Sequence, residues 1–269
     1  MLVLIVLISI AACALVLWTL GLFYANDFSV PTCHDVPAGK RVLVIFPHAD
    51  DEGLNAGGLL RTLSAHGCQV DWIILTRGEK GTPNGTMSEE LKTIRPQEAA
   101  TVAKILRINA PQQKDYPDGD VDRYMGELKA DLAAELARFQ PEIVLTYDLA
   151  GMYGHPDHIA VAEVVTELVR TQPNVRLWYV SYPRRQIDAL TLPERMAKDV
   201  AFKASRVYPT HKMYVGLRGI RCKLRVLKAY RSQRQSYRDS FPLRFVPMWC
   251  YVILTPFEYY HEVPAEKAA

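Results

Sequence analysis

The chain has 269 residues, of which 49% are hydrophobic and 23% are charged, and its formal net charge is +3. This size suits one α/β domain with a sizeable core, preceded by a short extra segment. Five scattered cysteines without a CxxC pair argue against a disulfide scaffold and against a thiolate zinc site.

The first predicted element is an uncharged apolar run over residues 2–24, which is rich in Leu, Val, Ile and Ala. A helix of this length crosses a hydrocarbon core of about 30 Å. Trp18 and the aromatic pair Phe23 and Tyr24 suit the membrane interface. No Lys or Arg precedes the run and no good A-x-A site follows it, so we expect an uncleaved anchor over residues 1–25 rather than a signal peptide.

The next segment, residues 26–40, is predicted to be a linker, because Pro31 and Pro37 disfavour helix. The nearest positive charges after the apolar run are Lys40 and Arg41. They favour a single-pass membrane protein whose domain lies on the cytoplasmic side.

Strand and helix patterns alternate through the predicted domain, residues 41–269. Strands are expected at 41–46, 70–76, 143–147 and 175–181, helices at 55–66, 88–108, 123–139 and 159–169, and a loop at 111–120. Asn55 is the expected N-cap of its helix. The alternation predicts an α/β fold with a Rossmann-like, mostly parallel sheet and helices on both faces.

Two polar clusters stand about a hundred residues apart, each directly after a predicted strand: Pro-His-Ala-Asp-Asp-Glu at 47–52 and Gly-His-Pro-Asp-His at 154–158. Active sites of open α/β sheets form at this carboxyl edge. Imidazoles and carboxylates there suit a divalent metal, which lowers the pKa of bound water to about 7 and so drives hydrolysis. More candidates compete than one ion needs: His48, Asp50, Asp51, His155 and His158.

With these motifs the chain resembles the PIG-L/LmbE-like family of zinc-dependent de-N-acetylases, many of which act on N-acetylglucosamine conjugates. The family motifs P/A-H-P-D-D-E and H-P-D-H match residues 47–52 and 155–158, although Ala49 stands where the family usually has Pro. The resemblance spans roughly residues 41–169, with a weaker match at 230–233. It implies that His48, Asp51 and His158 bind Zn²⁺, with Fe²⁺ as the alternative metal.

The resemblance also implies the catalytic residues. Asp50 would be the general base that takes a proton from the zinc-bound water. A cationic His155 would stabilise the oxyanion, with help from Tyr153. Asp157 is expected either to orient a ligand imidazole or to cap the following helix.

Two further segments resemble substrate-contacting parts of the family. Arg95 and Glu98 lie in an R-x-x-E-A segment, and Asp118 lies in a Tyr-Pro-Asp-Gly loop. The resemblance implies that these three residues bind the amino-sugar substrate. The alternatives are a surface ion pair for the first two residues and an ordinary turn for the third.

A basic block occupies residues 203–238, with eleven Lys or Arg and no Asp or Glu. The rest of the chain therefore has 32 − 11 = 21 basic and 29 acidic residues, a net charge of −8. No nucleic-acid motif accompanies the block, so a nucleic-acid partner is not expected. An anionic membrane surface or an anionic substrate is the expected partner, and a solvated basic helix face is the alternative.

The leading hypothesis is a membrane-anchored, metal-dependent amidohydrolase that removes acetyl from an N-acetylglucosamine-type amino sugar, either lipid-linked or otherwise anionic. A deacetylase of a soluble thiol-sugar or of an antibiotic intermediate is the first alternative, although it needs no anchor. The second is a phosphoesterase with two metal ions, which needs ligands for both. The third is a non-catalytic binding module tethered to a membrane.

Overall fold

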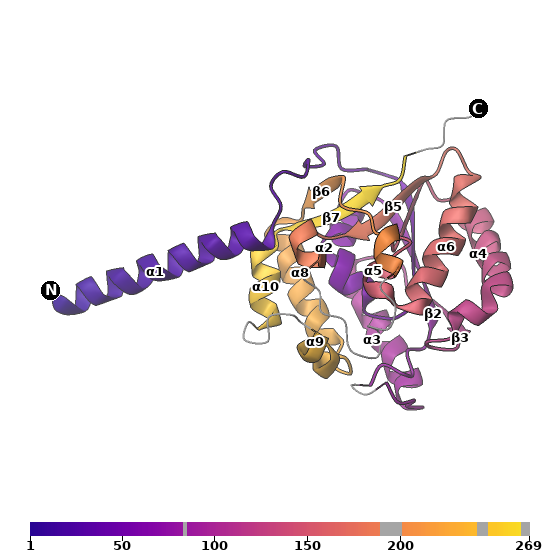
Figure 1. The fold of residues 1–269 in the computed structure, drawn as a ribbon, viewed down its shortest axis with the longest axis horizontal. Coiled ribbons are helices and arrows are strands. Elements are labelled where there is room, and N and C mark those ends of the chain that lie inside the picture. Colours follow the sequence, from indigo (N-terminus) through magenta and orange to yellow (C-terminus); the bar gives the residue numbers. More distant parts are fainter. Residues whose placement is uncertain (83–84, 189–200, 241–246, 265–269) are drawn as a thin grey trace.

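The computed structural model describes residues 1–82, 85–188, 201–240 and 247–264, and a seven-stranded sheet forms its centre (Figure 1). The strands are β1 (Arg41–Phe46), β2 (Gln69–Thr76), β3 (Gln112–Tyr116), β4 (Ile143–Thr146), β5 (Arg176–Ser181), β6 (His211–Tyr214) and β7 (Phe257–Glu262). Their order is β3-β2-β1-β4-β5-β7-β6. Strands β1 to β5 pair in parallel, whereas β7 is antiparallel to β5 and β6. The predicted mostly parallel α/β fold is confirmed.

Helices cover both faces of the sheet (Figure 1). The helices of the described chain are α1 (Leu2–Ala25), α2 (Asp51–Ala65), α3 (Leu91–Leu106), α4 (Met125–Phe139), α5 (Gly151–Gly154), α6 (Pro156–Arg170), α7 (Arg184–Asp188), α8 (Gly216–Ala229), α9 (Arg234–Ser240) and α10 (Met248–Leu254), with short 3₁₀ turns at Val121–Tyr124 and Ala201–Ser205. Helices α2 and α3 pack on one face, and α8 packs outside them. Helices α4 and α6 pack on the other face.

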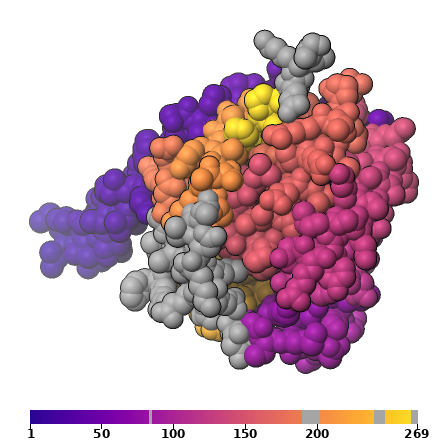
Figure 2. Space-filling model, turned by 45° about the vertical axis from the view of Figure 1, so that its right-hand side comes forward, coloured from indigo at the N-terminus to yellow at the C-terminus, as the bar shows by residue number. Residues whose placement is uncertain are grey.

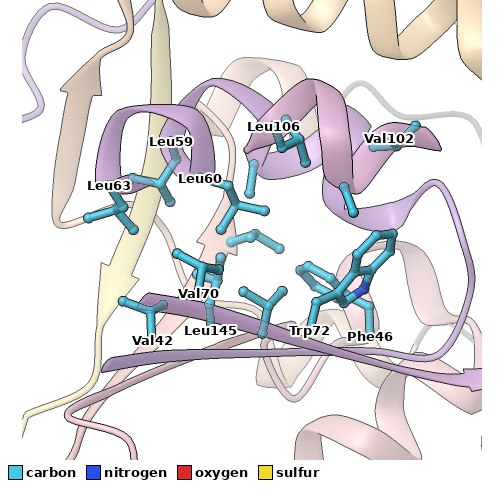
Figure 3. Close-up of a cluster of buried hydrophobic side chains, with 14 of the residues drawn as sticks. Val42, Phe46, Leu59, Leu60, Leu63, Val70, Trp72, Val102, Leu106 and Leu145 are labelled. Atoms are coloured by element: carbon cyan, nitrogen blue, oxygen red, sulfur yellow. The ribbon is translucent and has the colours of Figure 1, made fainter. Parts of the chain in front are cut away.

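The core follows from the alternation of side chains along the buried strands. Val42 and Phe46 of β1 point toward α2 and α3, where they meet Leu60 and Leu106 (Figure 3). Leu43, between them in the sequence, belongs to the cluster beneath α4 and α6. Both faces of the strand are buried, which explains its continuous apolar sequence.

Several predicted element boundaries differ from those of the structure, and the differences at α2 and β3 have a physical reason. Helix α2 begins at Asp51, so Asn55 lies inside the helix and donates its side-chain amide to the carbonyl of Asp51 (2.7 Å). The carboxylates of Asp51 and Glu52 suit the first helical turn, although they lack the apolar spacing that marks a helix. Residues 112–116, predicted to be loop, form β3, and this edge strand pairs only with β2 and needs no apolar run.

Helix α1 projects away from the rest of the molecule (Figure 2). By length and composition it is a candidate membrane span, and a signal sequence meets the same test. The predicted linker after it contacts the domain, since the backbones of Pro31 and Cys33 both pair with Lys212 on β6 (2.8 and 2.7 Å). The predicted division into anchor, linker and domain stays a prediction, and the domain's last residues, 265–269, lie outside the described residues.

Candidate metal centre and active site

The two polar clusters meet at the carboxyl ends of β1 and β4. His48 follows β1, and His155 and His158 lie at the start of α6, beyond β4. Strands β1 and β4 are neighbours in the sheet, with β2 and β3 on one side and β5 on the other. This position, where the strand order reverses, is where open α/β sheets form a crevice for ligands.

Three side chains converge as a candidate metal-binding set. Nδ1 of His48 lies 3.2 Å from Nε2 of His158 and 3.6 Å from Oδ2 of Asp51. Nε2 of His158 lies 3.7 Å from the same carboxylate oxygen. Tetrahedral zinc with bonds of about 2.0–2.1 Å separates its ligand atoms by about 3.3 Å. Two imidazoles and one carboxylate at this spacing therefore fit a metal ion with one open position.

The ligand candidates are held by buried partners. Nε2 of His48 contacts Asp157 (3.0 Å) and Asp118 (3.1 Å), so this nitrogen carries the proton and leaves Nδ1 free to bind a metal. The hydroxyl of Tyr147 donates to Oδ1 of Asp51 (2.6 Å), which leaves Oδ2 directed at the two histidines. Such partners fix the orientation of metal ligands. Of the two roles considered for Asp157, the structure shows the contact with an imidazole, that of His48.

Asp50 lies beside the candidate metal set and not within it. It has a positive φ of 108°, a strained conformation for a residue other than glycine. Its backbone N–H donates to Glu52 (3.1 Å), and its carboxylate pairs with Arg95 (3.2 Å). Burial raises the pKa of Asp50 to about 6, against the opposing effect of the Arg95 guanidinium. A carboxylate with this pKa is suited to accept a proton near neutral pH.

The surroundings of His155 disfavour the cationic imidazole that was expected at this position. Burial, together with the charges of His48 and His158, lowers the pKa of His155 to about 3. Its Nδ1 accepts a hydrogen bond from the backbone N–H of Asp157 (3.2 Å), so the ring proton resides on Nε2. Tyr153 packs edge-on against His158, with ring centroids 5.1 Å apart, and follows a residue of positive φ, Met152.

Comparison with known proteins agrees with this geometry. Residues 43–169 match the model of the PIG-L family, described as GlcNAc-PI de-N-acetylase. These residues contain both polar clusters and the strands that precede them.

Residues 43–169 form a PIG-L domain.

Similar proteins are named as deacetylases. Diacetylchitobiose deacetylase of Thermococcus kodakarensis is 35% identical over 121 residues, which cover 44% of this chain and 45% of that protein. The 1D-myo-inositol 2-acetamido-2-deoxy-alpha-D-glucopyranoside deacetylase of Mycolicibacterium vanbaalenii is 31% identical over 157 residues, which cover 48% of this chain and 54% of the relative. The chain thus spans about half the length of the curated relatives it matches.

A solved structure shows the same fold over most of the chain. N,N'-diacetylchitobiose deacetylase from Pyrococcus horikoshii superposes with a TM-score of 0.58 at 22% sequence identity, over 84% of each chain. The likeness therefore extends beyond the PIG-L domain to the C-terminal helices and strands.

The predicted substrate-contacting residues of the PIG-L domain lie in the walls of the site. Arg95 is 3% exposed and donates to the carbonyl of Ala49 as well as to Asp50. Glu98 accepts hydrogen bonds from the backbone and hydroxyl of Ser232 (3.0 and 2.6 Å). Asp118 is buried against His48. In this structure all three orient other residues of the protein, and their contact with substrate stays a prediction.

Sequence reasoning gave no role to three residues of the site, Tyr147, Glu52 and Tyr230, although Glu52 belongs to the first motif. Glu52 is fully buried, accepts a hydrogen bond from Tyr230 (2.7 Å), and burial raises its pKa to about 8. Tyr230 and Ser232 come from the segment after α8, 72 and 74 residues beyond His158, the last residue of the second motif. The weak match at residues 230–233 was the only signal that this segment belongs to the site.

Proposed function

We propose that the chain is a metal-dependent N-deacetylase of N-acetylglucosamine conjugates. The observation that carries the proposal is the meeting of His48, Asp51 and His158 beside Asp50, at the carboxyl edge of a PIG-L domain. Hydrolysis of an amide is helped by a base that takes a proton from the attacking water and by a donor to the carbonyl oxygen. The carboxylate beside the metal set and the imidazole of His155 can supply these two groups.

The donor set fits one Zn²⁺ ion. Bound there, zinc would lower the pKa of a water molecule to about 7 and polarise the acetyl carbonyl. A second candidate group in the described chain, His48 with His155 and Asp157, shares His48 with the first and cannot hold a second ion independently. This argues against a two-metal phosphoesterase.

The protein's own residues carry the proton transfers. Asp50 accepts a proton from the water that attacks the acetyl carbonyl. The Nε2–H of neutral His155, together with the hydroxyl of Tyr153, donates to the carbonyl oxygen as negative charge develops there. The proton on Asp50 then passes to the amine nitrogen as the C–N bond breaks, which releases acetate and the free amino sugar.

We propose a lipid-linked or otherwise anionic substrate. Helix α1 is apolar enough to anchor the protein, and residues 203–238 supply cations that pair with phosphate. The family description and the names of both relatives refer to glucosamine-type substrates. The family description and the name of the Mycolicibacterium vanbaalenii relative refer to inositol conjugates. Lys40 and Arg41 after the helix favour a single-pass protein with its catalytic domain on the cytoplasmic side.

The test is acetate release by the full chain in detergent, from N-acetylglucosaminyl-phosphatidylinositol, the inositol conjugate without lipid, and diacetylchitobiose. We expect one metal ion per chain, and about 10²-fold or more slower release by Asp50→Asn with its metal retained. His48→Ala is the matched control and should lose the metal itself. No acetate from any of the substrates with metal bound would refute deacetylation, and equal turnover of lipid-linked and soluble conjugates would refute the lipid preference.

A further inference from the structure

The last turn of α1 is fixed to the domain rather than joined by a free tether. The side chain of Asn26 is fully buried and donates to the carbonyls of Leu22 (2.8 Å) and Leu254 (2.7 Å). Arg185 donates to the carbonyls of Phe23 and Asn26. The direction of α1 therefore sets the orientation of the whole domain.

One layer of the domain lies on the side from which α1 projects. In Figure 1, α4 and α6 lie beyond the sheet at the far end from α1, whereas α8 and α10 lie next to its base. Helix α10 contacts both α1 and α8. If α1 crosses a bilayer, α8 and α10 lie close to the lipid headgroups, together with α7, whose Arg185 contacts the last turn of α1.

This layer exposes a surface that we name the α8/α10 face. Its apolar members are largely exposed: Phe28 (51%), Tyr214 (58%), Leu217 (69%) and Trp249 (55%). Its cations follow one another at three- and four-residue spacing, and all are exposed: Arg218, Arg221, Arg225 and Lys228. Residues at this spacing share one side of a helix.

The opposite side of α8 explains why this stripe faces outward. Gly219, Cys222 and Val226 are buried, and they lie on the side that packs against α2 and α3. Among the residues that the structure describes, no carboxylate lies within 4.0 Å of any of the four cations in the stripe. Among the described residues, therefore, no carboxylate neutralises the positive charge of the α8/α10 face by direct contact.

We propose that the α8/α10 face lies against an anionic bilayer surface, which rests on the proposed role of α1 as a membrane anchor. Aromatic and leucine side chains at the base of an anchor enter the headgroup region, and the cations beside them attract anionic lipid. The carboxyl end of α8 leads to Tyr230 and Ser232, which contact Glu52 and Glu98 in the active site. Docking would thus bring this wall of the site close to a lipid-linked substrate.

The test uses Trp249 as a depth probe in the full chain. Trp18→Phe removes the tryptophan in α1, and Trp72 and Trp178 are fully buried, so Trp249 is the exposed tryptophan of this variant. The variant is reconstituted into vesicles of phosphatidylcholine, alone or mixed equally with phosphatidylserine, whose acyl chains carry bromine. We expect quenching of Trp249, absent from Trp18→Phe/Trp249→Phe, that is stronger in the anionic vesicles.

Charge reversal supplies the decisive comparison. Arg218→Glu/Arg221→Glu/Arg225→Glu should lower the quenching of Trp249 by about half or more. The matched control, Arg123→Glu/Lys129→Glu/Arg170→Glu, changes charge by the same amount on the side of α4 and α6 and should leave quenching unchanged.

Four outcomes would overturn the inference. Equal quenching with and without Trp249 would place the α8/α10 face away from the lipid. Equal quenching in the two vesicle types would mean that charge does not hold the face on the membrane. Equal quenching in the two triple variants would mean the same. Failure of the chain to enter vesicles would refute the anchor on which the inference rests. Acetate release from diacetylchitobiose, measured in parallel, reports on the proposed deacetylase independently of docking.

Discussion

Asp51 uses its two carboxylate oxygens differently. Oδ2 faces His48 and His158, whereas Oδ1 accepts the hydroxyl of Tyr147, whose ring also stacks on His158 with centroids 4.1 Å apart. One buried tyrosine therefore orients two of the three candidate ligands. The affinity of the site for metal therefore depends on Tyr147, which is not itself one of the candidate ligands.

Tyr147→Phe should weaken metal binding. The substitution keeps the stacked ring but removes the hydrogen bond to Asp51, and loss of such a partner typically costs about 10–100-fold in metal affinity. Competition with a chelator measures the change. Tyr179→Phe is the control, because this buried tyrosine pairs with Thr166 (2.6 Å) away from the metal set. Equal metal affinities for the two variants would contradict the role assigned to Tyr147.

Arg95→Lys should lower kcat and leave KM nearly unchanged. Nη2 of Arg95 donates to the carbonyl of Ala49 and to the carboxylate of Asp50, while Nη1 donates to the carbonyl of Gly78 (3.4 Å), and the single nitrogen of lysine cannot reproduce this fork. We expect kcat to fall about 10-fold or more, with metal content unchanged. Steady-state kinetics on diacetylchitobiose would measure both constants. A rise in KM at constant kcat would instead support the predicted contact between Arg95 and the substrate.

At this scale the sequence predicted the residues that share a short motif. His48, Asp51 and His158 come together because each motif follows a parallel strand of the same sheet. Tyr147 could not be predicted, because a tyrosine at the end of a strand looks like ordinary core, and the weak match at residues 230–233 gave Tyr230 no defined role. Their function depends on tertiary contacts that no local pattern records.

At the scale of elements, α2 and α8 pack closely against each other. Gly58 of α2 and Gly219 of α8 both face Val215, and a β-carbon on Gly58 would lie 2.8 Å from that of Val215. Beside them, Lys223 of α8 and Glu258 of β7 form a buried ion pair (2.7 Å). Helix α2 carries the metal-ligand candidate Asp51, so the position of α8 bears directly on the site.

Gly58→Ala should destabilise the protein by about 1–3 kcal/mol, because the added methyl group overpacks this helix crossing. Gly126→Ala is the matched control in α4, where a β-carbon would meet nothing within 4 Å. It should instead stabilise by up to about 1 kcal/mol through the higher helix propensity of alanine. Urea unfolding measures both changes. Equal effects would show that α2 and α8 do not pack this closely.

The elements up to β5 were largely predictable, since apolar strands and amphipathic helices have distinct periods, whereas no bounds were predicted for the elements after β5. The errors fall where tertiary structure overrides local pattern. Helix α2 begins at the charged residues Asp51 and Glu52, and β3 is a polar edge strand that forms beside β2. Both features need the sheet to be in place before they can be recognised.

For the whole molecule, the sequence did not predict how the segment after α1 packs on the domain. In this segment, which was predicted to be a linker, Asn26 is fully buried. The backbone N–H of Asp27 donates to the hydroxyl of Tyr259 (2.8 Å). Lys212 donates to the carbonyls of Asp27 and Phe28 (both 3.1 Å). Prolines in a sequence indicate the absence of helix, but they do not show whether the chain is free or packed.

Two deletions separate packing from anchoring. Removal of residues 2–20 takes away most of the apolar helix but keeps every contact of Asn26 with Leu22 and Leu254, so the melting temperature in detergent should stay close to that of the full chain. Removal of residues 2–28 also loses the hydrogen bonds of Asn26 and the packing of Phe28 on Phe257. Several lost contacts of about 1 kcal/mol each should lower the melting temperature by about 5 °C or more. Equal melting temperatures for the two deletions would mean that the segment is a tether after all, and the orientation of the domain on a membrane would then no longer follow from α1.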